Sequence, residues 1–271
     1  MSQLARLKFT SFGLKVPTNW QEPQGQAADH YGKAFQDGEK VTAPGAPPLF
    51  QPASMNKYHT QAQKMHIDKI GKFIDDTTKA ICSAWSQWQT ATTMVGVVIN
   101  AVTAVGGQLV GPPLTPLILA TAPKNTPSEL KYSNVIAQVI GTAWLAFTAT
   151  VKIPGLPWYP AYAAVPSPMA PPVPNTPVPF ATLTQVPTSI GSAIMKQQMV
   201  AQLADPQAPF HKELFESITD AFEKSYNLWK VSTMVTQVMP TLAPVPTFAP
   251  PYVPVGPVVG GVAAMLPGGL K

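Results

Sequence analysis

The chain has 271 residues, a net charge of +5 and only 11% charged residues, less than half of the roughly 25% found in typical soluble domains. Its 32 prolines are more than twice the expected share of about 5%. The 18 basic residues are scattered, so they lack the clustered stripe of a nucleic-acid-binding protein, and the single cysteine excludes an internal disulfide.

Residues 1–55 predict an extended N-terminal arm. Gly, Pro and Gln are frequent there, and prolines 44–52 exclude regular structure around them. The loose alternation of residues 7–16 leaves a strand open as an alternative. No uninterrupted apolar segment precedes Lys15, so we expect no signal peptide and a cytoplasmic assembly, with a finished particle as one end state.

Helical periodicity begins near Ser54 and returns three times. The first helix is weakened at its end by Gly96 and a β-branched run, and residues 115–123 read as an extended apolar piece. Thr126 or Ser128 is a suitable cap for the second helix. The fold class is therefore mainly α, with long Pro-rich extended or irregular arms. The expected helices are roughly 55–98, 128–151, 188–203 and 210–238.

Three of these helices carry a repeated aromatic signature, in residues 80–88, 139–147 and 221–229. Each copy has an aliphatic residue or Phe at position two, a small residue at five and aromatic residues at six and nine. Spacings of three and four place these positions on one helix face. We expect them to form a shared core: Trp85, Trp88, Trp144, Phe147, Tyr226 and Trp229. Chance recurrence of ordinary core residues is the alternative.

An uncharged tail follows each signature helix, with no charge in residues 80–123, 153–195 and 231–270. Helix and tail together suggest a diverged repeat, although the spacing is too irregular for a solenoid. The expected organisation is an N-terminal arm and three repeats. Their bounds are 1–55, 56–123 (helix and Pro/Gly tail), 124–187 (helix and Pro-rich arm) and 188–271 (two helices and C-terminal arm).

No stretch carries recognisable catalytic or metal-binding chemistry. A Gly-x-Ser-x-Gly elbow and a phosphate-binding loop are both missing. The four histidines are dispersed, and Cys82 reads as a buried, inert thiol. We therefore expect neither an enzyme nor a cofactor or metal site.

Membrane association through residues 94–121 is the second functional hypothesis. This stretch lacks charge, but glycines and a proline pair interrupt it. A spanning helix needs about 20 consecutive apolar residues, and extended backbone cannot face lipid.

The first hypothesis is a non-enzymatic structural protein that assembles, as a homo-oligomer or with other subunits, into a phage-like or contractile-injection-type particle. Uncharged, proline-stiffened arms lose little entropy when they dock on neighbours. A smaller version, a ligand for SH3 or WW modules, lacks the usual flanking basic residues. Aromatic anchors of the arms would carry the interface, so Trp158→Ala should weaken assembly and leave helix content intact. These anchors are Trp158, Tyr159, Tyr162, Phe248 and Tyr252.

Overall fold

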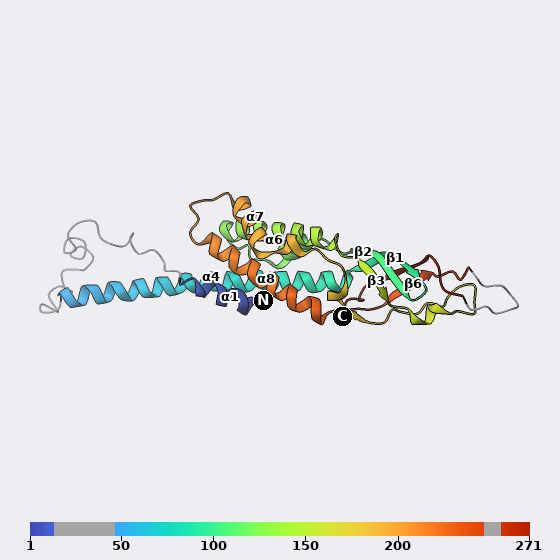
Figure 1. The fold of residues 1–271 in the computed structure, drawn as a ribbon. Coiled ribbons are helices and arrows are strands. Elements are labelled where there is room, and N and C mark those ends of the chain that lie inside the picture. Colours follow the sequence, from blue (N-terminus) through green and yellow to red (C-terminus); the bar gives the residue numbers. More distant parts are fainter. Residues whose placement is uncertain (14–46, 247–255) are drawn as a thin grey trace. The chain divides into compact units, whose positions relative to one another are not determined.

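The computed structural model describes residues 1–13, 47–246 and 256–271, with side chains described from residue 68 onward and in residues 1–13 (Figure 1). The chain forms two compact units. The larger unit contains residues 1–11 and 74–271, and the smaller contains residues 12–73.

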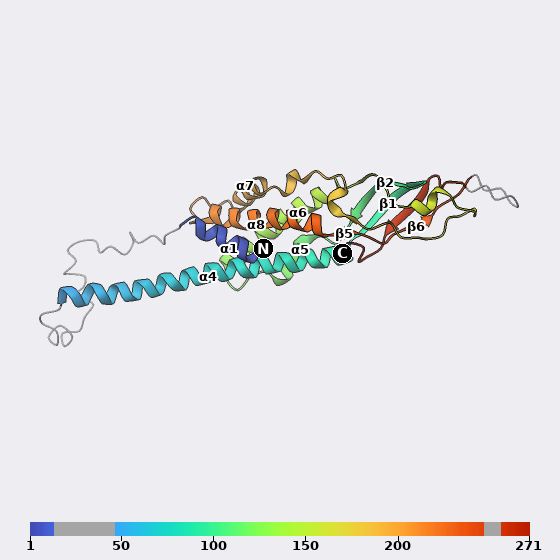
Figure 2. The ribbon, with the colours of Figure 1, turned by 60° about the horizontal axis from the view of Figure 1, so that its bottom comes forward.

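Six α-helices and a five-stranded sheet make up most of the regular structure of the described residues. The helices are α1 (Ser2–Ser11), α4 (Pro47–Ala91), α5 (Leu114–Thr121), α6 (Pro127–Thr148), α7 (Ser192–Leu203) and α8 (His211–Ser232). The residues of α4 from Ile74 on belong to the larger unit. Within that unit the helices lie together at one end and the strands at the other (Figures 1 and 2).

The sheet is antiparallel throughout, in the order β3-β2-β1-β7-β6. Its strands are β1 (Thr93–Asn100), β2 (Thr103–Val110), β3 (Ile153–Pro157), β6 (Val238–Leu242) and β7 (Gly261–Met265). A separate pair joins β4 (Val178–Pro179) to β5 (Met234–Val235). The strand β7, near the end of the chain, is therefore inserted between β1 and β6.

The expectation of a mainly α fold with about four helices is wrong, because a five-stranded antiparallel sheet accompanies six helices. The first expected helix ends at Ala91, and the β-branched run after Thr92 becomes β1 instead of a weak helix end. Residues 153–157, expected to be irregular, form β3 at the sheet edge, where proline is tolerated.

Further segments differ from expectation: α4 already begins at Pro47, where prolines were expected to exclude regular structure, and β6 and β7 lie in the expected C-terminal arm. Ser2–Ser11 is a helix rather than an extended arm or strand, and Leu114–Thr121 is a helix rather than an extended piece. Both are short, with little capping or periodicity of their own, so tertiary contacts decide their state. In contrast, α6 is specified locally. Its Thr126 hydroxyl accepts a hydrogen bond from the Glu129 amide and the Glu129 carboxylate accepts from the Thr126 amide, with Pro127 in the first turn.

A break in alternation shapes β1. Met94 and Val97 are buried while Val95 and Val98 are exposed, although strict alternation would place residues three apart on opposite faces. Gly96 lies between them with φ of +71°, and the pairing of β1 with β7 shifts at the same place. Glycine adopts this conformation without a steric penalty. The irregularity thus turns both Val95 and Val98 to the same open face.

The N-terminal helix α1 is fastened to the larger unit by polar contacts around a buried Ala5. Arg6 Nε donates to Asp75 Oδ1 at 2.8 Å, and the Ser2 hydroxyl donates to the same oxygen. Lys8 Nζ lies 3.1 Å from Glu216 Oε1 on α8. Partial desolvation alone would raise the pKa of Asp75, but the hydrogen bonds from Ser2 and Arg6 outweigh it and hold that pKa below its ordinary value of 3.8.

Acid should therefore loosen α1. A carboxyl whose pKa is lowered by folding stabilises the folded state above its unfolded pKa, and this contribution is lost as the pH falls through the folded pKa. We expect Asp75→Asn to lower the thermal midpoint slightly at pH 6, by an amount that shrinks below pH 3.8. Because the pair is half exposed, the effect at pH 6 should stay below about 1 kcal/mol. A difference between variant and wild type that stays constant from pH 6 to pH 2.5 would contradict the assignment.

Candidate functional site

The three signature helices meet in one aromatic cluster, contributed by α4, α6 and α8. Trp144 stands at its centre, with ring centroids 4.9 Å from Trp85, 4.8 Å from Trp88 and 6.0 Å from Trp229. Phe147 and Tyr226 are 5.1 Å apart beside it. The six residues expected at the shared core are thus brought together, and all except the half-buried Trp229 are buried.

Two members of the cluster were missing from the expected set. Phe222, at position two of the third signature, lies 5.0 Å from Trp85. Phe180, from the Pro-rich arm, lies 4.7 Å from Trp229. Phe180 is the only aromatic residue between Tyr162 and Phe210. A single aromatic residue in a long Pro-rich stretch was the sequence feature that could have identified it as a member of the cluster.

The cluster provides packing rather than a reactive centre. The indole nitrogens of Trp85 and Trp144 are buried without a hydrogen-bond partner, and Trp229 Nε1 donates to Gln89 Oε1 at 2.8 Å. Burial raises the pKa of Tyr226 far above its ordinary value, so this phenol stays neutral. A buried, uncharged cluster of this kind stabilises the fold through apolar burial and aromatic contacts.

The aromatic residues expected to anchor the arm on a neighbour are buried in their own chain. Trp158, Tyr159 and Tyr162 are exposed by 2% or less. Tyr159 donates its hydroxyl hydrogen to the Val238 carbonyl on β6 at 2.8 Å, and the Tyr162 hydroxyl accepts from the Val173 amide at 2.8 Å. Tyr159 thus ties the arm to its own sheet and Tyr162 ties the arm to itself, and the buried side chains are not available to a partner. The other two expected anchors, Phe248 and Tyr252, lie outside the described residues.

The open face of the sheet carries an apolar row across all five strands. Strand register places these residues side by side: Pro154 on β3, Val105 on β2, Val98 on β1, Val262 on β7 and Leu242 on β6. All five are exposed, with Val98 at 37% and Leu242 at 51%. Antiparallel sheets with one open face normally turn polar residues outward.

The sheet also lacks charge. Its five strands contain no Asp, Glu, Lys, Arg or His, whereas the helices around the aromatic cluster carry both signs. Lys152, directly before β3, stands at the rim. A contiguous apolar surface with a polar rim is the usual composition of a protein-binding patch.

Both edges of the sheet are blocked against further strands. The edge strand β3 contains Pro154 and Pro157, and the edge strand β6 contains Pro240. Proline lacks the amide hydrogen that a ladder needs, and natural sheets use it to prevent edge-to-edge pairing. The sheet is therefore closed laterally and open on its face.

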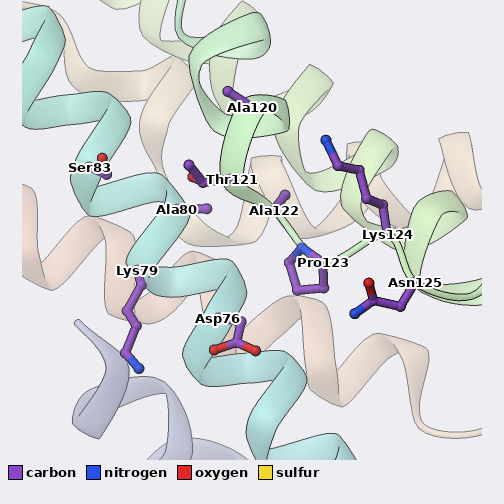
Figure 3. A pocket seen from close by; sticks show the side chains of 10 residues that line it. All are labelled: Asp76, Lys79, Ala80, Ser83, Ala120, Thr121, Ala122, Pro123, Lys124 and Asn125. Carbon is purple, nitrogen blue, oxygen red and sulfur yellow. The ribbon is translucent and has the colours of Figure 1, made fainter.

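A groove of about 420 Å³ lies between α4 and the segment that joins α5 to α6 (Figure 3). Ala80, Ala122 and Pro123 form much of its wall, and the Asp76 carboxylate projects toward it. The Lys79 amino group points away from Ala80 and Ala122, whereas the Lys124 side chain runs toward α5, where its Nζ donates to the Leu119 carbonyl at 3.3 Å. One inward carboxylate among small apolar side chains does not define a reaction or a ligand.

A metal site and the single cysteine were also considered as sites of chemistry, and neither shows a suitable arrangement. The described side chains contain no group of three or more His, Cys, Asp or Glu placed to hold a metal ion. Cys82 is exposed rather than buried as expected, with its Sγ 3.9 Å from Met1 Sδ.

Residues 94–121, the expected membrane stretch, form most of β1, then β2 and α5. Among the helices that the structure describes, none has both the length and the apolar character needed to cross a bilayer.

Comparisons with protein-family models, with curated proteins and with solved structures gave no match to this chain.

Proposed function

We propose that the protein is a non-enzymatic structural subunit that assembles with copies of itself, and that the open face of its sheet is a subunit contact. The observation that carries this proposal is the apolar row across the sheet, which consists of Pro154, Val105, Val98, Val262 and Leu242. It is apolar, uncharged and continuous over five strands, which is costly to leave in water and inexpensive to desolvate in a contact.

The rest of the unit supports a contact at this face rather than at the arms. The aromatic anchors Trp158, Tyr159 and Tyr162 are already buried within their own chain, and the aromatic cluster is buried except for the half-buried Trp229. Most large apolar residues exposed on the helices have a charged residue close by in the chain, as Leu228 and Val231 have Lys230, and Leu145 on α6 is the exception. Single exposed residues of this kind are normal on protein surfaces.

The test is the solution mass of three purified chains in detergent-free buffer. Wild type should scatter as a multiple of 28.9 kDa, and Val105→Asp should shift the mass toward 28.9 kDa because it places a charge in the row. Val186→Asp is the matched control, since Val186 is 50% exposed but lies outside the five strands, with its amide bonded to the Thr150 hydroxyl after α6.

Two results would overturn the proposal. One is a wild-type monomer at every concentration, and the other is an oligomer whose mass Val105→Asp leaves unchanged. Recovery of wild type only in detergent would favour the membrane hypothesis instead.

A further inference from the structure

We infer that the partner of the open sheet face is the same face of a second copy, so that two copies pack row on row about a twofold axis along β1. This inference rests on the proposed function and specifies how its contact is built. In a twofold contact each patch meets itself, so the patch must be complementary to its own rotated image.

The row meets this requirement. Val98 lies in the central strand, with Val105 and Val262 one strand away on either side and Pro154 and Leu242 two strands away. Turning the face over about an axis along β1 places Val98 opposite its own copy and Val105 opposite Val262. Pro154 then faces Leu242. Every pairing joins apolar side chains, and the two sheets form an aligned sandwich about 10 Å apart.

Charge favours the same arrangement. The chain carries +5 overall, so two copies repel each other at long range, and a contact surface without charge of its own adds nothing to that repulsion. The sheet strands carry no charge. Lys152, at the β3 rim, comes to lie by the uncharged β6 of the second copy, and the two Lys152 residues stand at opposite sides of the contact.

The size of the face sets the strength of the contact. Five strands spaced about 4.8 Å apart, over roughly five residues each, cover on the order of 400–500 Å² per copy. Stable interfaces bury about 800 Å² per partner. The sheet face alone therefore supports a reversible contact, which dissociates on dilution unless loops around the sheet extend it.

Charge complementation tests the geometry. Val98→Asp and Val98→Lys should each weaken self-association by about 100-fold or more, because the axis brings two like charges together. An equimolar mixture of the two variants should recover the lost mass, because Asp then faces Lys. The readout is sedimentation equilibrium over a dilution series, with circular dichroism as the check on folding. Val186→Asp and Val186→Lys, alone and mixed, should behave as wild type.

A cross-linking variant covers the case in which a charged strand residue fails to fold. Val98→Cys in a Cys82→Ser background should give a covalent dimer with a short bismaleimide, whereas Val186→Cys should not. The absence of that dimer from folded, oligomeric protein would overturn the inference.

The outcomes separate the two proposals. Loss of mass in both single variants without recovery in the mixture means that the face binds a different surface of the next copy. The inference then fails and the proposed function stands. Unchanged mass in both folded variants means that both proposals fail.

Discussion

Trp144→Ala is expected to lower the free energy of unfolding by about 3–5 kcal/mol, the usual cost of removing a fully buried tryptophan. Trp144 is 2% exposed, and its ring lies within 6.3 Å of six other aromatic rings from α4, α6 and α8. Its removal leaves a cavity where three helices meet, and three helices cannot all close on it together.

Chemical denaturation provides the measurement for Trp144→Ala. The midpoint should fall while the slope stays close to that of wild type, as for a lower stability without a change in surface exposed on unfolding. Leu145→Ala is the control on the same helix, because Leu145 is 65% exposed and should change stability by less than about 0.5 kcal/mol. Equal losses in the two variants would contradict a central role for Trp144.

Trp158→Ala is expected to cost a similar amount, about 3–5 kcal/mol, but in a different part of the unit. Trp158 is 1% exposed at the start of the Pro-rich arm, and its carbonyl accepts a hydrogen bond from the Thr176 amide at 3.0 Å. Prolines donate no amide hydrogen bonds, so buried side chains hold much of this arm in place. The variant should release the arm before the helices unfold, rather than act at a contact with a neighbour.

Amide hydrogen exchange distinguishes these two effects. Trp158→Ala should accelerate exchange of the Tyr159 and Thr176 amides, which donate to Val102 and Trp158 carbonyls, and leave the amides of α6 protected. Met169→Ala, at a 42% exposed position of the same arm, should leave all of these rates close to wild type. Uniform acceleration across α6 and the arm would show instead that the unit unfolds as one.

The helices that were predicted most accurately from the sequence are those whose ends and inward faces are determined by neighbouring residues. Thr126, Pro127 and Glu129 define the start of α6 within four residues, and α7 and α8 overlap the expected helices 188–203 and 210–238. The aromatic spacing of three and four residues put Trp85 and Trp144 on the inward faces of their helices. These patterns depend only on neighbours along the chain.

The sheet depends on distant partners, and for that reason the sequence did not predict it. Val97 and Val98 are both apolar but lie on opposite faces of the sheet, so the sequence of β1 does not alternate between apolar and polar residues. The two central positions of the turn between β1 and β2 are Ala101 and Val102 rather than Gly or Asn, and Ala101 adopts a φ of 52°. The candidate contact was hidden for the same reason. The sequence shows that each strand lacks charge. It does not show that Val105, Val98 and Val262 lie side by side, because this depends on the register of strands that are far apart in the chain.

The place of β7 in the sheet has a consequence for how the protein is made. β7 pairs with β1, more than 160 residues earlier in the chain, and separates β1 from β6. At about 5–20 residues per second, a ribosome takes roughly 10–30 s to travel from one to the other. During that interval the β1–β2 hairpin has an unpaired, uncharged β1 edge, which other nascent chains can join. This hairpin is where we expect a holding chaperone to bind, and the prolines of the edge strands protect the sheet only after β7 has closed it.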